Sequence, residues 1–535
     1  MKRSIGAALA AFCVGLLLYA ALLWPLPGML RTATVEGTFH DSHAWCFWYM
    51  SELRAGRAGW VTETIGWPEP AGLRFIAWGP AMLVAPLQGL LGGLGAYNAA
   101  LLLTGGLNTV GGFLLARTLG ARDGAAVAGG LVLAACPFAL DTLANGQIAK
   151  MQLWVLAVYL VSVRLSMRWW IVLPVVPLAA LLVAVTSPSL AMFLPVALAV
   201  LLPLVVAEER TWRSGLVGLA AAGLSARALL WIRGHYEPVG GLQAVSAFAP
   251  ANVETGNHAA LLEGVARLDS VLLGGSTAGL HADHVIYLGI PALILAVVLG
   301  VRRQPVALAG LVLVLLGGLL ALGPRLADSS GFISQGGQDL LMPAYLLEVW
   351  GYPIARSGMY HRFLVLSGFG LCLLVAGGRR RHVAVAMACA VLLIGDGLRQ
   401  RSERWPRPVA EVPGLRALAA IRDDPGAGAV VVFPLRVDDR GGGTQIMLSL
   451  LHGRQTSGLP RYDGWRQRGA RQVMDWMEAA ESEADARAFL GDQGIRHVLW
   501  TPWVPHRDGG PDADSLTALL GPPQRDGALM WWTLP

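Results

Sequence analysis

The chain has 535 residues, of which 55% are hydrophobic and 14% are charged, and its mean hydropathy is +0.53. An average soluble domain carries about 25% charged residues, so this composition excludes a wholly soluble globular chain. The formal net charge of +6 comes from residues 1–397, where arginines separate apolar runs, whereas residues 398–535 have an ordinary composition and balanced charge. This distribution is typical of membrane topology and gives no reason to expect nucleic-acid binding.

Apolar runs close to the ~20 residues that cross a bilayer predict about eleven transmembrane helices. In chain order they lie at about 5–24, 96–117, 124–140, 150–167, 169–187, 188–207, 214–232, 285–301, 306–323, 360–377 and 383–397. The first run is long for a signal peptide and predicts an uncleaved helix. A twelfth candidate, 75–94, is interrupted by Pro80 and Pro86. We interpret it as re-entrant or interfacial, because the arginine pairs between the other runs then share one side with Lys2 and Arg3.

The positive-inside rule places that side in the cytoplasm. The N-terminus is then cytoplasmic, and four longer loops are external: 25–95, 141–149, 233–284 and 324–359. Residues 1–397 form the predicted membrane domain of a multi-pass protein of a bacterial inner membrane, and residues 398–413 form a linker. Residues 414–535 are predicted to be a small periplasmic α/β domain. Its expected strands are 429–433, 496–500 and 529–534, and its expected helices are 411–422, 444–452 and 466–490.

The first external loop contains the densest group of chemically useful side chains. A carboxylate, Asp41, lies between His40 and His43 and is followed by Trp45 and further aromatic residues. The carboxylate suits a general base, the imidazoles could bind a substrate or a metal ion, and aromatic rings stack on sugars. The alternative is an interfacial amphipathic helix that Asp41 merely caps, since Trp and Tyr also mark membrane interfaces.

Polar residues at the external ends of other runs form a second group of candidates. Gln147 and Lys150 belong to the second loop, which begins at Asp141. Arg227 lies inside run 214–232, and a charge within a span is a functional hypothesis by default. Arginine suits a phosphate ligand, which also draws attention to a basic cluster made of Arg356, His361 and Arg362. Snorkelling or helix capping would explain most of these residues without a ligand. The triad His281, Asp283 and His284 has metal-like spacing but no fourth ligand, so a polar helix start explains it better.

Several short stretches resemble bacterial membrane proteins of the GT-C (glycosyltransferase C) type that carry a C-terminal extracytoplasmic domain. They occur in the same order along most of the chain. They are Tyr97-Asn98…Leu114-Leu115-Ala116-Arg117, Pro137-Phe138…Asn145-Gly146-Gln147…Leu153-Trp154, Tyr287-Leu288-Gly289-Ile290-Pro291, Ala321-Leu322-Gly323-Pro324, Arg356-Ser357-Gly358-Met359-Tyr360-His361-Arg362-Phe363, Val432-Phe433-Pro434…Leu451-His452-Gly453…Ser457-Gly458 and Gly494-Ile495-Arg496-His497-Val498.

This resemblance implies a GT-C-like membrane enzyme that uses a polyprenyl-phosphate-linked sugar. In this family an acidic residue of the first external loop acts as the base, and by position that residue corresponds to Asp41. The resemblance also implies that Arg227, Arg356 and Arg362 hold the departing lipid phosphate. Gln147 replaces a histidine that is frequent in relatives, so this position cannot titrate. The first loop has no Asp-x-Asp pair, and a divalent metal cofactor therefore stays open.

The expected function is transfer of a sugar to a lipid or glycan acceptor on the extracytoplasmic face. Two alternatives stay open. One is a non-enzymatic membrane protein that binds or presents a lipid-linked glycan. The other is a transporter or flippase of such a lipid, although the sequence lacks the internal repeat that many transporters show.

Overall fold

The structure is a computed structural model with side chains, and it divides into two compact units. The first, called here the helical unit, comprises residues 1–24, 77–80 and 100–407. The second, called the mixed unit, comprises residues 25–76, 81–99 and 408–535. The residues that the structure describes are 2–35, 40–56, 61–62, 71–72, 78–209, 212–236, 266–273, 287–300, 305–328, 331–335, 338–349, 360–377, 382–399, 409–412, 414–433, 448, 451–456, 482–502 and 511–534.

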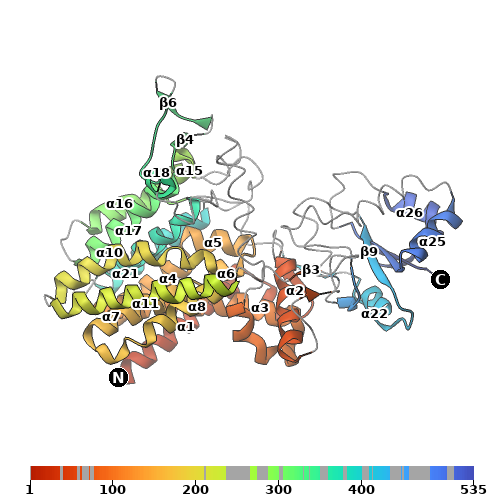
Figure 1. The fold of residues 1–535 in the computed structure, drawn as a ribbon, viewed down its shortest axis with the longest axis horizontal. Coiled ribbons are helices and arrows are strands. Elements are labelled where there is room, and N and C mark those ends of the chain that lie inside the picture. The colour runs from red at the N-terminus through yellow and green to blue at the C-terminus, as the bar shows by residue number, and fades with distance from the viewer. Residues whose placement is uncertain are drawn as a thin grey trace. The chain divides into compact units, whose positions relative to one another are not determined.

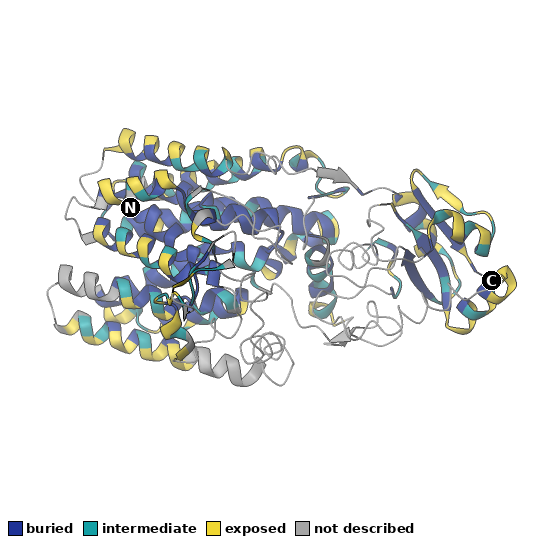
Figure 2. Ribbon diagram, turned by 90° about the horizontal axis from the view of Figure 1, so that it is seen from above, coloured by how far each residue is buried: buried dark blue, intermediate teal, exposed yellow. Residues whose placement is uncertain are grey.

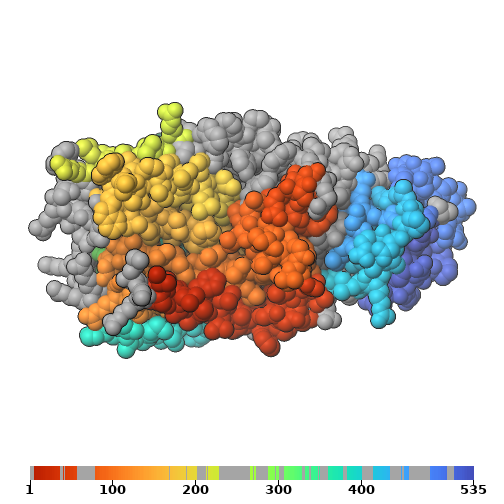
Figure 3. Space-filling view, turned by 90° about the horizontal axis from the view of Figure 1, so that it is seen from below, coloured from red at the N-terminus to blue at the C-terminus, as the bar shows by residue number. Residues whose placement is uncertain are grey.

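The helical unit is a bundle of apolar helices (Figure 1). Its longer helices are α1 (Lys2–Leu22), the second part of α3 (Trp78–Thr118), α4 (Asp123–Ala134), α7 (Leu153–Arg168), α8 (Val175–Thr186), α10 (Leu194–Glu209), α11 (Trp212–Tyr236), α16 (Ile290–Gly300), α17 (Pro305–Ala321), α20 (Leu364–Ala376) and α21 (Val383–Arg399). Shorter helices join them, namely α5 (Pro137–Ala144), α6 (Ile148–Met151), η2 (Trp170–Val172), α9 (Pro188–Ala191), α15 (Leu268–Leu273), α18 (Tyr345–Val349) and η4 (Tyr360–Phe363). On the face shown in Figure 3, α7 and α8 form a continuous yellow-orange surface.

Glycines allow the central helices to approach closely. A Cβ atom at Gly112 would lie 2.8 Å from the Cα of Gly130, and one at Gly310 would lie 2.8 Å from the carbonyl oxygen of Gly370. These contacts join α3 to α4 and α17 to α20. Small residues at helix contacts are the usual solution in membranes, where lipid competes with side chains for apolar contact. These glycines of the apolar runs therefore act as packing positions.

The outer faces of the helical unit are apolar as well. Exposed residues (yellow in Figure 2) include Leu178 on α8, Val298 on α16 and Val391 on α21, which are 64%, 55% and 66% exposed. A soluble protein would cover such a surface, whereas lipid solvates it. The chain is therefore a membrane protein.

Each of the eleven predicted runs coincides with one or more helices. Within the described residues, three helices are long and apolar enough to span a membrane: Ile5–Leu22, Gly79–Thr118 and Ile148–Met167. A fourth span arises if α4 and α5, bent by 43°, count as one. The remaining apolar helices are shorter, so the number of eleven crossings and their orientation stay predictions.

Within the segment 75–94, for which we expected a re-entrant or interfacial structure, the described residues 78–94 belong to helix α3. Gly92, with φ 70° and ψ 177°, breaks the helix, and Pro86 lies in its first part. Residues 81–99 belong to the mixed unit, and residues 100–407 belong to the helical unit. The break therefore lies close to the boundary between the two units.

The C-terminal part of the mixed unit is a small α/β layer, as predicted. Four strands lie in the order β11-β12-β10-β9, with β9 (Ala429–Phe433) parallel to β10 (Ile495–Trp500) and the other pairs antiparallel. The remaining two are β11 (Gln524–Asp526) and β12 (Leu529–Thr533), and the helices are α22 (Leu415–Asp423), α25 (Glu483–Asp492) and α26 (Ala513–Leu520). The expected strands all appear, with ends shifted by one residue at most. Most of the expected helix 444–452 and the first part of 466–490 lie outside the described residues.

The first loop belongs to the same unit. Strand β1 (Ala33–Val35) pairs antiparallel with β8 (Val409–Glu411), and the Val412 N–H donates to the Thr32 carbonyl over 2.7 Å. Helix α2 (His40–Arg54) follows β1, and the short strands β2 (Val61–Thr62) and β3 (Ala71–Gly72) pair with each other. Residues 409–411, part of the segment predicted as a linker, thus form a strand.

A small β structure lies between α17 and α18 in the helical unit. Strand β4 (Ala327–Asp328) pairs with β5 (Gly331–Phe332), and β6 (Ser334–Gln335) pairs with β7 (Gln338–Asp339). An ion pair of 2.8 Å between Arg325 and Asp339 closes its base. The described residues of the predicted external loop 324–359 therefore include two short strand pairs and helix α18.

Candidate functional site

In the mixed unit, His40 begins α2 and is anchored inside the protein. Its Nδ1 lies 2.7 Å from the hydroxyl of Tyr97, and neither residue is exposed. Asp41 is the second residue of α2, and its side chain lies outside the described part. His43 is half-buried on the first turn. The His40–Tyr97 bond therefore fixes the end of the helix on which the expected base lies.

The aromatic residues of α2 form a packed cluster. Trp45 is 1% exposed and stacks on Tyr49 with ring centroids 4.8 Å apart, while Trp48 lies 6.2 Å from Trp45. Phe47 meets Tyr97 edge to face at 5.2 Å. Trp45, which we expected to contact a substrate, is thus mostly occupied in stabilising α2, and Trp48 is the more accessible ring.

Residues of α3 on both sides of the break at Gly92 hold this loop in place. Asn98, fully buried, donates through Nδ2 to the carbonyls of Leu30 and Ala33, both over 2.8 Å. Gln88 donates to the carbonyl of Phe47 within α2. The resemblance had marked Tyr97 and Asn98 without a role, and their role in the structure is to position the loop.

In the helical unit, the second loop forms a compact group of polar side chains. Asp141, Asn145 and Gln147 are 7%, 1% and 8% exposed, and the Lys150 ammonium donates to the Gln147 side-chain oxygen over 2.6 Å. Pro137 starts α5 after the bend, and Gly146 takes the positive φ of 72° that the turn before α6 requires. Gln147 thus orients Lys150, and this role does not require a side chain that can gain or lose a proton.

Two contacts bring distant segments to the end of the bundle where α5 lies. A Cβ at Gly368, in the second turn of α20, would lie 2.7 Å from Cys136 Sγ, and one at Gly397 would lie 3.7 Å from Leu140 Cδ1. The start of α20 and the end of α21 therefore meet the region of α5. We call this region, with residues 136–150, 287–290, 360–368 and 393–399, the polar end of the helical unit.

Helix η4 brings two of the expected cations to the polar end. His361 is 7% exposed and Arg362 is half-buried, directly before α20. Arg227 lies on α11 and is exposed; no contact in the described residues joins it to the polar end. Arg356 and the residues 281–284 lie outside the described part of the chain.

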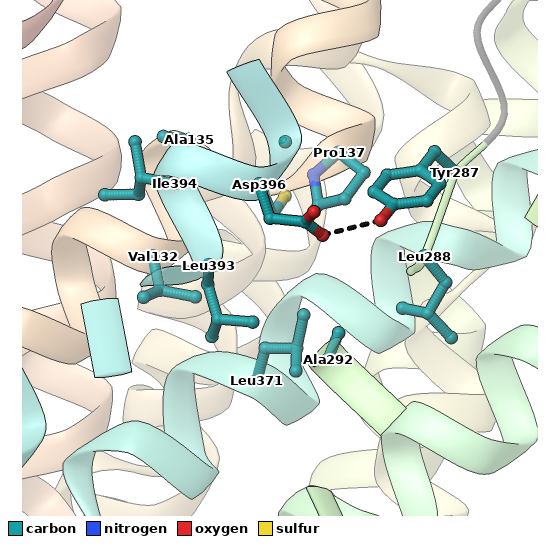
Figure 4. Close-up of a pocket in the computed structure, with 12 residues that line it drawn as sticks. Val132, Ala135, Pro137, Tyr287, Leu288, Ala292, Leu371, Leu393, Ile394 and Asp396 are labelled. Carbon is teal, nitrogen blue, oxygen red and sulfur yellow. Dashed lines mark hydrogen bonds between the residues drawn. The ribbon is translucent and has the colours of Figure 1, made fainter. Parts of the chain in front are cut away.

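A hydrogen-bonded pair that the sequence did not suggest completes the polar end. Tyr287, 2% exposed, donates through its hydroxyl to Oδ2 of Asp396 over 2.6 Å (Figure 4). Asp396 lies near the end of α21, within the last predicted span, and is half-buried. Its position inside an apolar run was the available signal, since a carboxylate within a span is costly without a partner.

A second polar cluster lies in the C-terminal sheet and involves the tail motifs. Asp424 accepts from Arg496 Nε over 3.0 Å, and His497 Nε2 also lies 3.0 Å from its carboxylate. The hydrogen bond from Arg496 lowers the pKa of Asp424 to about 2. Burial, followed by the charge of Arg454, lowers the pKa of His497 to about 4, so this imidazole is neutral at pH 7.

Arg454 and His452 complete this cluster. Arg454 donates to the backbone carbonyls of Ile421, Asp424 and Gly426 at the end of α22. His452 is fully buried, accepts from the Arg454 N–H over 3.1 Å, and has its pKa lowered to about 3, mainly by burial. These contacts give hydrogen-bond donors to the backbone carbonyls at the end of α22 and join this helix end to the sheet. The tail motifs that contain His452 and His497 are therefore explained by their structural role. Among the described residues, no three His, Cys, Asp or Glu side chains are arranged to hold a metal ion.

No protein-family model matches the chain, and no curated protein sequence matches it either. Among solved structures, it is similar to the archaeal oligosaccharyltransferase AglB from Archaeoglobus fulgidus in complex with an inhibitory peptide and a dolichol-phosphate. The identity is 13%, the match covers 92% of this chain and 69% of that one, and the TM-score is 0.47. A second structure, the Archaeoglobus fulgidus oligosaccharyltransferase complex with zinc and sulfate, matches at 13% identity over 92% and 68% of the two chains, with a TM-score of 0.49. These values identify neither a family nor an activity for this chain.

Proposed function

We propose that this protein is a membrane glycosyltransferase that transfers a sugar from a polyprenyl-phosphate-linked donor to an acceptor on the extracytoplasmic face. The main support is the polar end of the helical unit. It gathers buried or half-buried polar side chains from four separate parts of the sequence into an otherwise apolar bundle. Such groups are costly in a membrane protein unless they pair or bind a ligand.

Two cations of the polar end suit the phosphate of the donor. Lys150 is held by Gln147, and Arg362 lies on η4 before α20. Charge-assisted hydrogen bonds from such groups bind phosphate oxygens strongly, and the apolar outer surface of the helices suits the lipid chain. Arg227 and Arg356 are further candidates for binding the phosphate. For these two residues the assignment rests on the resemblance to GT-C proteins.

Asp41 is the proposed general base, and the structured first loop supports this role. It accepts the proton of an acceptor hydroxyl while that oxygen bonds to the sugar's anomeric carbon. The bond from this carbon to the phosphate oxygen breaks through an oxocarbenium-like state, and the polyprenyl phosphate leaves with the electron pair. The His40–Tyr97 bond and the packed Trp45 stabilise the helix that carries the base. In this proposal His43 and Trp48, both half-buried on α2, contact the sugar.

The test replaces Asp41 with asparagine and measures sugar transfer with a membrane fraction and a labelled lipid-linked donor pool. General acid–base catalysis contributes about 10²–10⁴-fold, so Asp41→Asn should lower transfer by at least 100-fold, with normal expression. Glu36→Gln is the matched control, because it removes a carboxylate from the same loop outside the aromatic cluster. Asparagine is also a good N-cap, so a merely structural Asp41 would tolerate it. Transfer within a few-fold of the wild type would therefore exclude Asp41 as the base.

A further inference from the structure

Segment 338–349 of the helical unit exposes apolar side chains that the proposed transfer reaction does not use. It contains β7 and α18, and in Figure 1 α18 belongs to a group of short elements at the edge of the bundle. We call its exposed apolar side chains the outer patch: Leu340, Leu341, Tyr345, Leu346 and Val349. Leu341 and Val349 are 57% and 62% exposed. Single exposed apolar residues are common, but a group of them marks an interaction surface.

The opposite side of the same segment is fixed to the bundle. Ala344 is fully buried, and Met342 and Leu347 pack against the main apolar core of the helical unit. The Met342 N–H donates to the carbonyl of Pro324 over 2.9 Å, which joins the segment to the residues just after α17. Helix α18 is therefore amphipathic in its packing, and the outer patch faces away from the core.

Helix α17 sets the depth at which the outer patch lies. It has 17 residues, a length of about 25 Å, whereas the hydrocarbon core of a bilayer is about 30 Å thick. Arg302 and Arg303 precede its first turn and favour the opposite membrane surface for that end. Its other end, at Ala321, then lies at or below the edge of the core. Pro324 is at most about 11 Å farther along the chain, so the segment bonded to it lies in the headgroup layer.

The surface of α17 leads to the same place. One face of this helix carries exposed apolar side chains at spacings of three or four residues, namely Leu308, Val312, Leu315 and Leu319. This lipid-facing stripe ends within one turn of the end of the helix. Beyond it, Arg325 pairs with Asp339 over 2.8 Å, so these two charges compensate each other at the base of the segment. The outer patch thus continues an apolar surface that lipid already covers.

We propose that the outer patch rests on the lipid bilayer, at the boundary between headgroups and acyl chains, and anchors segment 338–349 to the membrane surface. Apolar faces of short amphipathic elements bury themselves at this depth, and tyrosine is enriched there because its ring is apolar and its hydroxyl is polar. The depth set by α17 and the continuity with its lipid-facing stripe favour lipid over a protein partner as the occupant.

The experiment attaches a nitroxide spin label to Leu346→Cys in the full-length protein. Cys13 and Cys46 are replaced by alanine, because the other three cysteines are buried. The protein is reconstituted into bilayers of equal parts phosphatidylethanolamine and phosphatidylglycerol. Collisions of the label are measured with oxygen, which concentrates in lipid, and with a water-soluble nickel chelate. We expect frequent collisions with oxygen and few with nickel.

Two reference sites calibrate this result. Leu178→Cys lies on the lipid-facing side of α8, and Leu415→Cys replaces a similarly exposed leucine of α22 in the C-terminal α/β layer. The oxygen-to-nickel ratio at Leu346→Cys should exceed that at Leu415→Cys and approach that at Leu178→Cys. Should Leu346→Cys fail to fold, Val349→Cys tests the same face.

Each of two other results would overturn the proposal. A ratio equal to that at Leu415→Cys would mean that the outer patch faces water. Few collisions with either reagent would mean that protein covers it, either another chain or a second copy of this one. The measurement requires no sugar transfer, so both results leave the proposed function untouched.

Discussion

Replacing Asn98 with leucine should release the first loop from α3. Leucine has a similar size but cannot donate, so the carbonyls of Leu30 and Ala33 would each lose their 2.8 Å hydrogen bond. Leaving a buried polar group without a partner costs about 1–3 kcal/mol. Two such losses, at the entrance to β1 and beside the His40–Tyr97 bond, would weaken the attachment of α2 and lower sugar transfer.

The thiol of Cys46 offers a local measurement of this release. Burial raises its pKa from 9.0 to about 12, and alkylating reagents attack the thiolate. A rise of three units lowers the thiolate fraction about 10³-fold at pH 8. In the wild type Cys46 should therefore react slowly, and in Asn98→Leu its alkylation, followed by mass spectrometry of the α2 peptide, should accelerate by up to about 10³-fold.

Asn108→Leu is the control for this experiment. Asn108 is equally buried and also bonds through Nδ2 to a backbone carbonyl, that of Met151 over 2.8 Å, but it lies in the helical unit. Its replacement should leave the reactivity of Cys46 unchanged. The reasoning fails if Cys46 of the Asn98→Leu variant is alkylated at the wild-type rate and the variant transfers sugar normally, because Asn98 would then not hold the loop.

Two further predictions concern the C-terminal region and the topology. Acidification should loosen the sheet in two steps. The folded pKa values of His497 and His452 are about 4 and about 3, against about 6.5 in the unfolded chain, so the contributions of both histidines fall as the pH drops below about 6.5. The contribution of Asp424, with a folded pKa of about 2, falls only below about pH 4. Hydrogen-exchange protection factors of 429–433 and 495–500 should fall between pH 6.5 and 4, and constant values would contradict the buried neutral His497. Reporter fusions after Arg213 should report cytoplasm and those after Pro535 periplasm; a cytoplasmic C-terminus would show that 75–94 crosses the membrane.

Local sequence patterns predicted the elements well but not their partners. Apolar period and length placed helices on all eleven runs, and the β-branched run 429–433 and the segments near 496–500 and 529–534 became strands. The roles within the site depended on contacts that no pattern contains. Tyr287 and Asp396 are 109 positions apart, and His40 and Trp45 resemble ligands in sequence but are buried by packing. A single sequence shows that a polar residue lies in an apolar run, but it does not show which residue is its hydrogen-bond partner.

The pairing of β1 with β8 explains why the two compact units of the structure do not coincide with the change in amino-acid composition along the chain. Composition changes near residue 398, yet the first loop packs with residues from 408 onward. Strand β1 has three residues, and so short a strand gains little from its own propensity. Its position is set by β8 on one side and by the two hydrogen bonds of Asn98 on the other. The helix that carries Asp41 therefore depends on residues more than 300 positions away, and the tail belongs to the structural support of the first loop.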